Sequence, residues 1–368
     1  MGASPLALPD FPWDSLREAK TRAAGHPGGI VDLSVGTPVD PVSPAIRAAL
    51  ASEPAQEPGY PATWGTTALR EAVAGAMARR YGVLGIDPDA VLPTIGSKEL
   101  VAWLPTLLGL GAGDVVVIPE LAYPTYEVGA RLVGADVVRA DSTAALGPRR
   151  VRLVWLNSPS NPTGRVLPPE QLREVVALAR EHDAVVASDE CYLALADPEE
   201  RATSVLHESV SGGAHTGLLA VHSLSKSSNL AGYRAGYLTG DPRLVAELLQ
   251  VRKHAGMMVP RPVQAAMVAA LDDDEHVAAQ WARYRSRRHR LREALTGSGF
   301  KIEHSEAGLY LWATEGRHCR QTVDRLAALG ILVAPGEFYG PSGAEYVRVA
   351  LTATDERVDE AVRRLDRR

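Results

Sequence analysis

The chain has 368 residues, of which 46% are hydrophobic and 23% are charged, and its net charge is −5. A globular chain of this length can bury a large core and usually divides into more than one domain. The acidic balance excludes a general positive field for nucleic acid or an anionic membrane, and it favours a small-molecule ligand.

Simple sequence signals for export, metal binding and membrane insertion are lacking. Cys191 and Cys319 lie far apart, without the spacing of a disulfide framework or a zinc site, so we expect no metal and a reducing, cytoplasmic location. The N-terminus has no basic region followed by an apolar stretch, which predicts no export signal. The longest apolar run, at 100–110, is broken by Pro105 and predicts a buried helix, not a membrane span.

Between residues 90 and 240, β-branched runs alternate with helical stretches, which is typical of βαβ units. Before this region, a helix is expected at 66–81, capped by Thr66 or Thr67. Within it, another helix is expected at 168–182, and seven runs predict strands, at 91–95, 115–119, 135–139, 153–156, 184–188, 218–222 and 236–239. The predicted fold is α/β, with a large, doubly wound, mostly parallel seven-stranded sheet.

After a helical stretch at 251–292 the pattern changes. Short strands are expected at 301–304, 308–313, 331–333 and 346–350, with helices at 319–329 and 355–365. This predicts three regions: an N-terminal arm of residues 1–40 that packs with the small domain, a large domain of residues 41–255, and a smaller α+β domain of residues 256–368. The arginine-rich run at 283–292 could suggest a nucleic-acid surface, but the acidic net charge favours a solvated helix face.

Lys226 is the strongest candidate for chemistry. It follows the predicted strand 218–222 within the run Ser223-Leu224-Ser225-Lys226. A lysine just past a buried strand, among small hydroxyl residues, is poorly solvated, so its pKa should fall toward the range in which a neutral amine attacks a carbonyl. This favours Schiff-base chemistry, although a lysine after a strand is more often a solvated chain end.

Two further motifs lie at strand ends. An Asn-Pro-Thr-Gly run at 161–164 follows one predicted strand, and Asp189 ends another and leads into Glu190-Cys191-Tyr192. Taken alone, the first is a turn and the second is a capping charge. Open α/β sheets bind ligands at the carboxyl ends of their strands, so together these motifs predict one site.

The motifs at 161–164, 189–192 and 223–226 and Arg234, in this order, resemble those of the fold-type-I aspartate aminotransferase family. The resemblance runs from about residue 32 to the C-terminus and implies a pyridoxal-phosphate-dependent homodimer. Within the family, the stretches 188–192, 221–236, 252–260 and 304–314 are most similar to succinyldiaminopimelate aminotransferases.

The resemblance implies roles for the cofactor site. Lys226 would hold pyridoxal 5′-phosphate as a Schiff base and then move a proton, and Asp189 would keep the pyridine nitrogen protonated. Tyr192 and Asn161 would bind the ring O3′, and Tyr123 would stack on the ring. The phosphate would be bound by a helix N-terminus, hydroxyls and cations, namely Gly96, Ser97, Lys98, Ser223 and Arg234, together with Tyr60 from across the dimer interface.

The same resemblance places the substrate. Arg348 would bind its α-carboxylate, with Asn161 beside it and the backbone at Gly36 closing over the same group. The implied reaction moves an amino group to 2-oxoglutarate, with N-succinyl-LL-2,6-diaminopimelate, an intermediate of lysine biosynthesis, as the expected donor. Its distal carboxylate could meet a cluster of cations, although these also suit a basic helix C-terminus: Arg252, Lys253 and Arg261.

Several alternatives stay open at this point. A C–S lyase and an aromatic or aspartate aminotransferase would share every residue named above, because fold and cofactor do not choose the reaction. A binding-only protein would need a broken site. The three glycines at 109, 111 and 113 precede a strand, so they lack the arrangement of a dinucleotide fingerprint.

Overall fold

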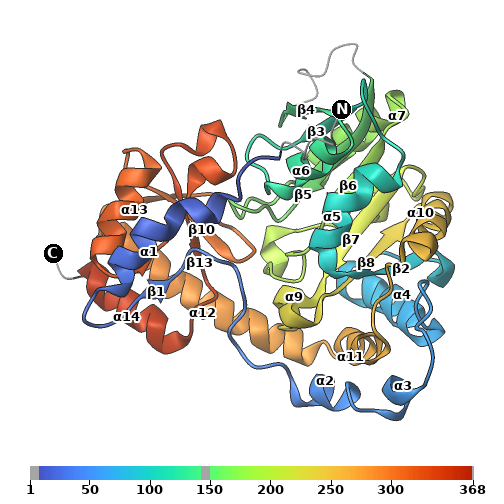
Figure 1. Cartoon of the computed structure of the whole chain (residues 1–368), viewed down its shortest axis with the longest axis horizontal. Coiled ribbons are helices and arrows are strands. Elements are labelled where there is room, and N and C mark those ends of the chain that lie inside the picture. The colour runs from blue at the N-terminus through green and yellow to red at the C-terminus, as the bar shows by residue number, and fades with distance from the viewer. Residues whose placement is uncertain (1–7, 142–149, 367–368) are drawn as a thin grey trace, which may run out of the picture.

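The computed structural model describes residues 8–141 and 150–366. The described residues contain two large sheets and one two-stranded sheet. The long helix α12 (Glu275–Gly297) runs between the parts of the molecule that hold the two large sheets (Figure 1). The larger sheet carries the middle of the chain. The smaller of the two lies in the C-terminal part of the chain, and the N-terminal helix α1 (Arg17–Ala24) packs against helix α13 (Cys319–Ala328) of that part.

The large sheet has the seven predicted strands. Their order is β2-β8-β7-β6-β5-β3-β4, and β8 is antiparallel to both of its neighbours while the other pairs are parallel. The strands are β2 (Val91–Ile95), β3 (Val115–Ile118), β4 (Asp136–Arg139), β5 (Val151–Asn157), β6 (Val185–Asp189), β7 (Leu218–Ser223) and β8 (Ala235–Gly240). The α/β prediction is therefore confirmed, with differences of one to two residues at strand ends.

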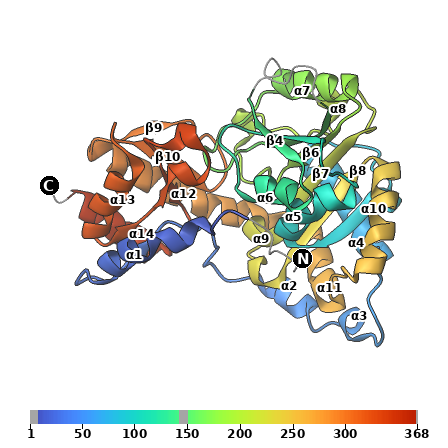
Figure 2. The same cartoon turned by 45° about the horizontal axis from the view of Figure 1, so that its top comes forward.

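Helices cover both faces of the large sheet (Figures 1 and 2). One face packs against α5 (Gly96–Leu107), α6 (Thr125–Leu132) and α10 (Pro242–Ala255). The opposite face packs against α2 (Pro44–Ala49), α4 (Thr67–Tyr81), α7 (Pro169–Glu181), α8 (Glu208–Ser211) and α11 (Arg261–Asp272). Burial on both faces explains why the central strands read as continuous apolar runs.

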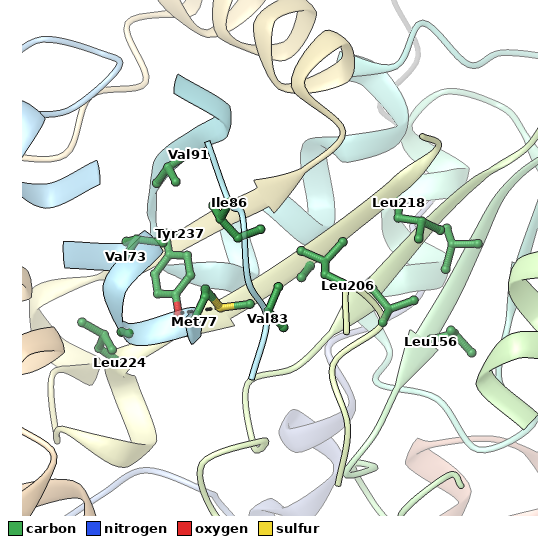
Figure 3. Close-up of a cluster of buried hydrophobic side chains, with 14 of the residues drawn as sticks. Val73, Met77, Val83, Ile86, Val91, Leu156, Leu206, Leu218, Leu224 and Tyr237 are labelled. Carbon is green, nitrogen blue, oxygen red and sulfur yellow. Dashed lines mark hydrogen bonds between the residues drawn. The ribbon is translucent and has the colours of Figure 1, made fainter. Parts of the chain in front are cut away.

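Figure 3 shows part of the second of these cores. Val73 and Met77 of α4 pack beside Tyr237 of β8, whose hydroxyl donates to Met77 Sδ at 3.7 Å. Thr66 caps α4 by accepting a hydrogen bond from the Leu69 amide at 3.2 Å. Of the two predicted capping residues, Thr66 and not Thr67 is therefore the cap. A cap of this kind stabilises a helix by about 1 kcal/mol.

The continuous helical stretch predicted at 251–292 is wrong. The helix α10 ends at Ala255, and Gly256 follows it with a left-handed φ of +68°, a conformation that terminates helices. The next two helices, α11 and α12, are separate, and α11 begins with a proline in its first turn. The helical periodicity continued across these breaks and concealed them.

The C-terminal part contains a four-stranded antiparallel sheet of order β12-β13-β10-β9. Its strands are β9 (Lys301–Glu303), β10 (Tyr310–Thr314), β12 (Ala334–Pro335) and β13 (Val347–Ala350), and its helices include α13 (Cys319–Ala328) and α14 (Asp355–Asp366). The predicted strand at 331–333 becomes β11 (Ile331–Leu332), which pairs in parallel with the N-terminal strand β1 (Val31–Asp32). The short helices are α3 (Glu53–Gln56), α9 (Leu224–Ser227), η1 (Pro12–Leu16), η2 (Pro88–Ala90), η4 (Pro198–Glu200), η5 (Ala231–Tyr233), η6 (Gly336–Phe338) and η7 (Pro341–Gly343).

The domain boundaries at residues 40 and 255 stay a prediction. The helix α11 packs against α2, α3 and α4 in the core of the large sheet, which favours placing the second boundary after α11. No helix in the described ranges is long and apolar enough to cross a membrane.

The arginine-rich run on α12 is a solvated face only in part: Arg283 and Arg285 are exposed, whereas Arg287 and Arg288 are buried, contrary to expectation. Arg287 is 1% exposed and forms ion pairs with Asp40 at 2.6 Å and Asp355 at 2.9 Å. Arg288 is also buried and donates to the carbonyl oxygens of Ser305 and Gly308. These contacts hold α12 against segments that precede it and follow it in the sequence. Arg287 and Arg288 are therefore not available to bind nucleic acid.

Candidate active site

Lys226 lies in α9, directly after the buried strand β7. The side chain of Ser223 caps this short helix, because its hydroxyl accepts a hydrogen bond from the Ser225 amide at 3.1 Å. The Lys226 ammonium group donates to the carbonyl oxygen of Gly36, which is a neutral partner. Burial lowers the pKa of the Lys226 amine. The amine is therefore closer to its neutral, nucleophilic form than a solvated lysine is.

Asp189 is the last residue of β6, the strand beside β7. Its side chain is buried; Oδ2 accepts the Tyr126 hydroxyl at 2.7 Å, and Oδ1 accepts the Cys191 amide at 3.2 Å. Burial raises the pKa of this carboxyl group. Neither of these two hydrogen-bond partners is a cation, so the carboxylate can still bind a positively charged group.

A cluster of cations and glycine backbone forms beside these strand ends. Gly96 opens α5 with a φ of +70°, and a side-chain Cβ there would lie 2.2 Å from Arg234 Nη2. Arg234 donates to the Ala231 carbonyl at 2.8 Å, a neutral partner. Burial and the neighbouring Arg234 lower the pKa of Lys98. A helix N-terminus with two cations suits an anionic group such as phosphate.

Arg348 lies on β13 and is 2% exposed. Its Nη1 donates to Asn161 Oδ1 at 2.8 Å, its Nη2 donates to the Ser34 carbonyl at 2.8 Å, and its buried Nε has no hydrogen-bond partner. The guanidinium carbon lies 3.9 Å from the centroid of the Tyr310 ring. A buried guanidinium with only neutral partners and an unsatisfied N–H can bind a carboxylate.

Aromatic residues surround these groups. The Tyr192 and Tyr310 hydroxyl oxygens are 3.1 Å apart, and burial raises the pKa of Tyr192 well above its usual value. Burial likewise raises the pKa of Tyr123 to about 12, and its ring packs edge-on against Tyr126 with centroids 5.7 Å apart. A Cβ at Gly36 would lie 2.1 Å from the Tyr310 hydroxyl, so this position has no room for a side chain.

Comparison with known proteins identifies the family to which the chain belongs. The Aminotransferase class I and II family matches residues 29–365, which is most of the chain.

The chain is a class I and II aminotransferase.

Two relatives are similar over nearly their whole length. The chain is 64% identical to a probable aminotransferase of Mycobacterium tuberculosis, over 99% of this chain and 88% of that protein. It is 59% identical to the 4-dedimethylamino-4-oxo-anhydrotetracycline transaminase of Streptomyces rimosus, over 97% of this chain and 99% of that protein. Among solved structures, a probable N-succinyldiaminopimelate aminotransferase from Thermus thermophilus is similar at a TM-score of 0.84 and 31% identity, over 96% of this chain and 99% of that chain.

Aminotransferases of this family depend on pyridoxal 5′-phosphate, and the residues of this site fit it. The desolvated Lys226 amine suits the aldehyde, and the buried Asp189 carboxylate suits the protonated ring nitrogen. A Cβ at Gly96 would clash with the Arg234 guanidinium, so this glycine lets the cation lie against the start of α5, an arrangement that suits a phosphate.

Some contacts were not expected from sequence. Trp13 of η1 donates from its ring nitrogen to the Ser34 carbonyl at 3.4 Å, and its ring lies 5.3 Å from that of Phe338. Lys98 Nζ lies 5.5 Å from the centroid of the Phe11 ring. The N-terminal segment therefore lies against both the cation cluster and the surroundings of Arg348. Its only sequence signal was a pair of aromatic residues around a proline.

Tyr60 stands apart from the residues above. Its side chain is 90% exposed in the single chain. Only its backbone has a described contact with a basic residue, a hydrogen bond from Arg261 to the Tyr60 carbonyl at 3.4 Å. One subunit alone thus does not bring the Tyr60 ring into the site, and its expected role needs a second copy of the chain.

Two of the three cations expected to meet a distal carboxylate are already engaged. Arg252 is 0% exposed, and its two terminal nitrogens bind Glu99 at 2.7 and 3.0 Å. Arg261 pairs with Glu57 at 2.8 Å. The expectation for Arg252 is wrong because a buried, doubly bonded guanidinium cannot turn to a ligand without leaving Glu99 unpaired. Ion pairs between residues so distant in sequence leave no local signal.

Proposed function

We propose that this aminotransferase transfers an amino group between an amino acid and 2-oxoglutarate at the cluster around Lys226, with pyridoxal phosphate as cofactor. The observation that carries the proposal is the pairing of a desolvated amine, Lys226, with a buried carboxylate, Asp189, at the ends of adjacent strands. These two groups have the chemistry that amino transfer requires at the aldehyde and at the ring nitrogen.

Each residue has a proposed task. Bound pyridoxal phosphate supplies an electron sink for the charge that develops at the substrate Cα. Lys226 binds the cofactor and then moves the proton from that Cα, while Asp189 keeps the ring nitrogen protonated. Arg348 and Asn161 fix the α-carboxylate so that the Cα–H bond has the orientation needed for cleavage.

The remaining contacts are proposed to hold the cofactor. Tyr192 binds the ring oxygen O3′ together with Asn161, and Tyr123 stacks on the ring. Five positions hold the phosphate, namely Gly96, Ser97, Lys98, Ser223 and Arg234. The backbone at Gly36 is proposed to close over the substrate, and the hydrogen bond from Lys226 to its carbonyl oxygen supports this role. We propose the cytoplasm as the place of this reaction.

For the amino donor we propose N-succinyl-LL-2,6-diaminopimelate, a substrate in lysine biosynthesis. The support is the sequence resemblance together with the similarity to the probable N-succinyldiaminopimelate aminotransferase from Thermus thermophilus. Because Arg252 is bound to Glu99, the distal carboxylate must be met by another group. A second candidate substrate is an oxo-anhydrotetracycline, as in the name of the Streptomyces rimosus relative. The rings of Phe11, Trp13 and Phe338, with successive centroids 5.5 and 5.3 Å apart, favour it.

We expect succinyl-diaminopimelate to be used at least about 100-fold more efficiently than aspartate or phenylalanine, because sites that bind a polar substrate group discriminate strongly against analogues that lack it. The measurement is kcat/KM for these donors and for cystathionine, with 2-oxoglutarate as acceptor. Amination of an oxo-anhydrotetracycline with glutamate as donor is assayed in parallel. A preference for phenylalanine or aspartate would contradict the donor assignment. Oxo-acid release from cystathionine without 2-oxoglutarate would instead indicate a C–S lyase.

We further propose a homodimer in which Tyr60 of each subunit binds the cofactor phosphate of the other. Loss of a hydrogen bond to a charged group costs about 1.5–3 kcal/mol, so Tyr60→Phe should weaken cofactor binding by at least about tenfold. Equal amounts of Tyr60→Phe and Lys226→Ala subunits are then mixed at a cofactor concentration that loads wild-type sites but not Tyr60→Phe sites.

The mixture has a distinctive expected result. Each mixed dimer would hold one site with neither substitution, so activity should rise to about a quarter of the wild-type value if subunits exchange freely. Native mass spectrometry of the mixture verifies the exchange. Proven exchange without a rise in activity would show that Tyr60 acts within its own subunit or not at all.

A further inference from the structure

Three metal-binding side chains meet outside the candidate active site, in the C-terminal part of the chain. His318 and Cys319 lie at the start of α13, and Glu337 lies in η6. Cys319 Sγ is 3.5 Å from Glu337 Oε2 and 3.9 Å from His318 Nδ1, and His318 Nε2 is 3.7 Å from the same Glu337 oxygen. We propose that His318, Cys319 and Glu337 form a binding site for a divalent transition metal, with zinc as the best match.

The spacing of the three side chains suits one tetrahedral ion. Zinc bonds of 2.3 Å to sulfur and 2.0–2.1 Å to nitrogen or oxygen place neighbouring ligand atoms about 3.3–3.6 Å apart. The two His318 distances are to different ring nitrogens, and only one of these can bind the ion. With one ligand atom from each residue, the three atoms lie within 4.8 Å of one another, so side-chain rotations would have to bring them closer together. Three protein ligands leave a fourth position for water.

The kinds of ligand also point to zinc. Zinc and cobalt bind thiolate and imidazole ligands well, whereas magnesium and calcium favour oxygen ligands. Cys319 is a free cysteine, 0% exposed, and its sulfur has only His318 and Glu337 as described partners. His318 is exposed, so an ion could enter from solvent.

Arg320 is the main competitor for Glu337, and it leaves the relevant oxygen free. Its Nε binds the other carboxylate oxygen, Oε1, at 2.5 Å, and its Nη2 donates to Ser15 Oγ at 3.0 Å. Arg320 can therefore orient Glu337 from behind while Oε2 faces the ion, as outer-sphere partners commonly do.

Two features oppose binding and set its strength. The Arg320 amide donates to His318 Nδ1 at 3.3 Å, and ligation through either ring nitrogen would disturb this long cap bond. The positive end of α13 also disfavours a cation. We therefore expect weaker binding than at a four-ligand structural zinc site. The bound ion would tie the start of α13 to Glu337, whose neighbour Phe338 packs against Trp13.

The test is a cobalt titration of the tag-free, cofactor-loaded protein. Cobalt bound to a thiolate gives a charge-transfer band in the near ultraviolet, and zinc should abolish this band by displacing cobalt.

Variants separate this site from adventitious binding. Cys319→Ser should lose the band, and the matched control Cys191→Ser, which alters the other cysteine, should keep it. Glu337→Gln should bind cobalt at least about tenfold more weakly. If Cys319→Ser does not fold, the test is made with Glu337→Gln and His318→Asn. These two substitutions replace half-exposed and exposed side chains, so the protein should tolerate them. Absence of the band in the wild type, or unchanged binding in Cys319→Ser or in both of the other variants, would overturn the proposal.

Discussion

Lys226→Ala is expected to lose transamination by about 10,000-fold or more while the protein keeps its fold. Proton transfer by a positioned side chain alone contributes up to about 10,000-fold, and the substitution also removes the nucleophile. Stability should not fall. Burial lowers the pKa of the Lys226 amine, so the folded state disfavours its charge at neutral pH, and its hydrogen bond is to a single carbonyl.

The experiment compares Lys226→Ala with Lys20→Ala, which removes an exposed lysine on α1. Activity with 2-oxoglutarate, the absorption of bound cofactor and the unfolding temperature are measured for both. We expect Lys20→Ala to match the wild type in all three. Lys226→Ala should retain the unfolding temperature and bind the cofactor only noncovalently. Transamination by Lys226→Ala at a rate near that of the wild type would remove this lysine from the mechanism.

The large sheet could be predicted because each of its strands is buried on both faces. The runs that became β6 and β7 needed only a local pattern of β-branched and apolar residues. The break after Ala255 was missed because α10 and α11 are both apolar on one face, and only Gly256 and the prolines beyond it marked the boundary. Pairing of β1 with β11 joins residues about 300 positions apart and leaves no local signal.

In the candidate site too, some residues could be predicted from the sequence and other contacts could not. Lys226 and Asp189 could be proposed because they lie at or just after the ends of predicted strands and belong to recognisable motifs, and their roles stay predictions. The contacts of Arg348 with Ser34 and Tyr310 depend on how the N-terminal segment packs on the small sheet, which no local pattern encodes. The metal-binding cluster is a further case. Glu337 lies 18 residues beyond Cys319 in sequence, and only the fold brings the two side chains together.

Asp189→Asn is expected to be the second most damaging change to catalysis. Asparagine has nearly the same shape, and its side chain can still accept hydrogen bonds from the Tyr126 hydroxyl or the Cys191 amide. The negative charge is what the substitution removes. Leaving a buried cation without its partner costs about 3–5 kcal/mol, which corresponds to a fall of about 100- to 4,000-fold in the rate of the step that depends on the protonated ring nitrogen.

This loss should fall on proton transfer from the substrate Cα, because that is the step in which the cofactor ring must accept charge. Single-turnover kinetics with normal and Cα-deuterated glutamate measure it directly, and a larger isotope effect in Asp189→Asn would place the loss there. Asp241→Asn is the matched control, since Asp241 is also buried and accepts backbone amides at the start of α10. We expect the control to change the unfolding temperature more than the rate. If Asp189→Asn left the single-turnover rate unchanged, this carboxylate would have only a structural role in joining Tyr126 to the end of β6.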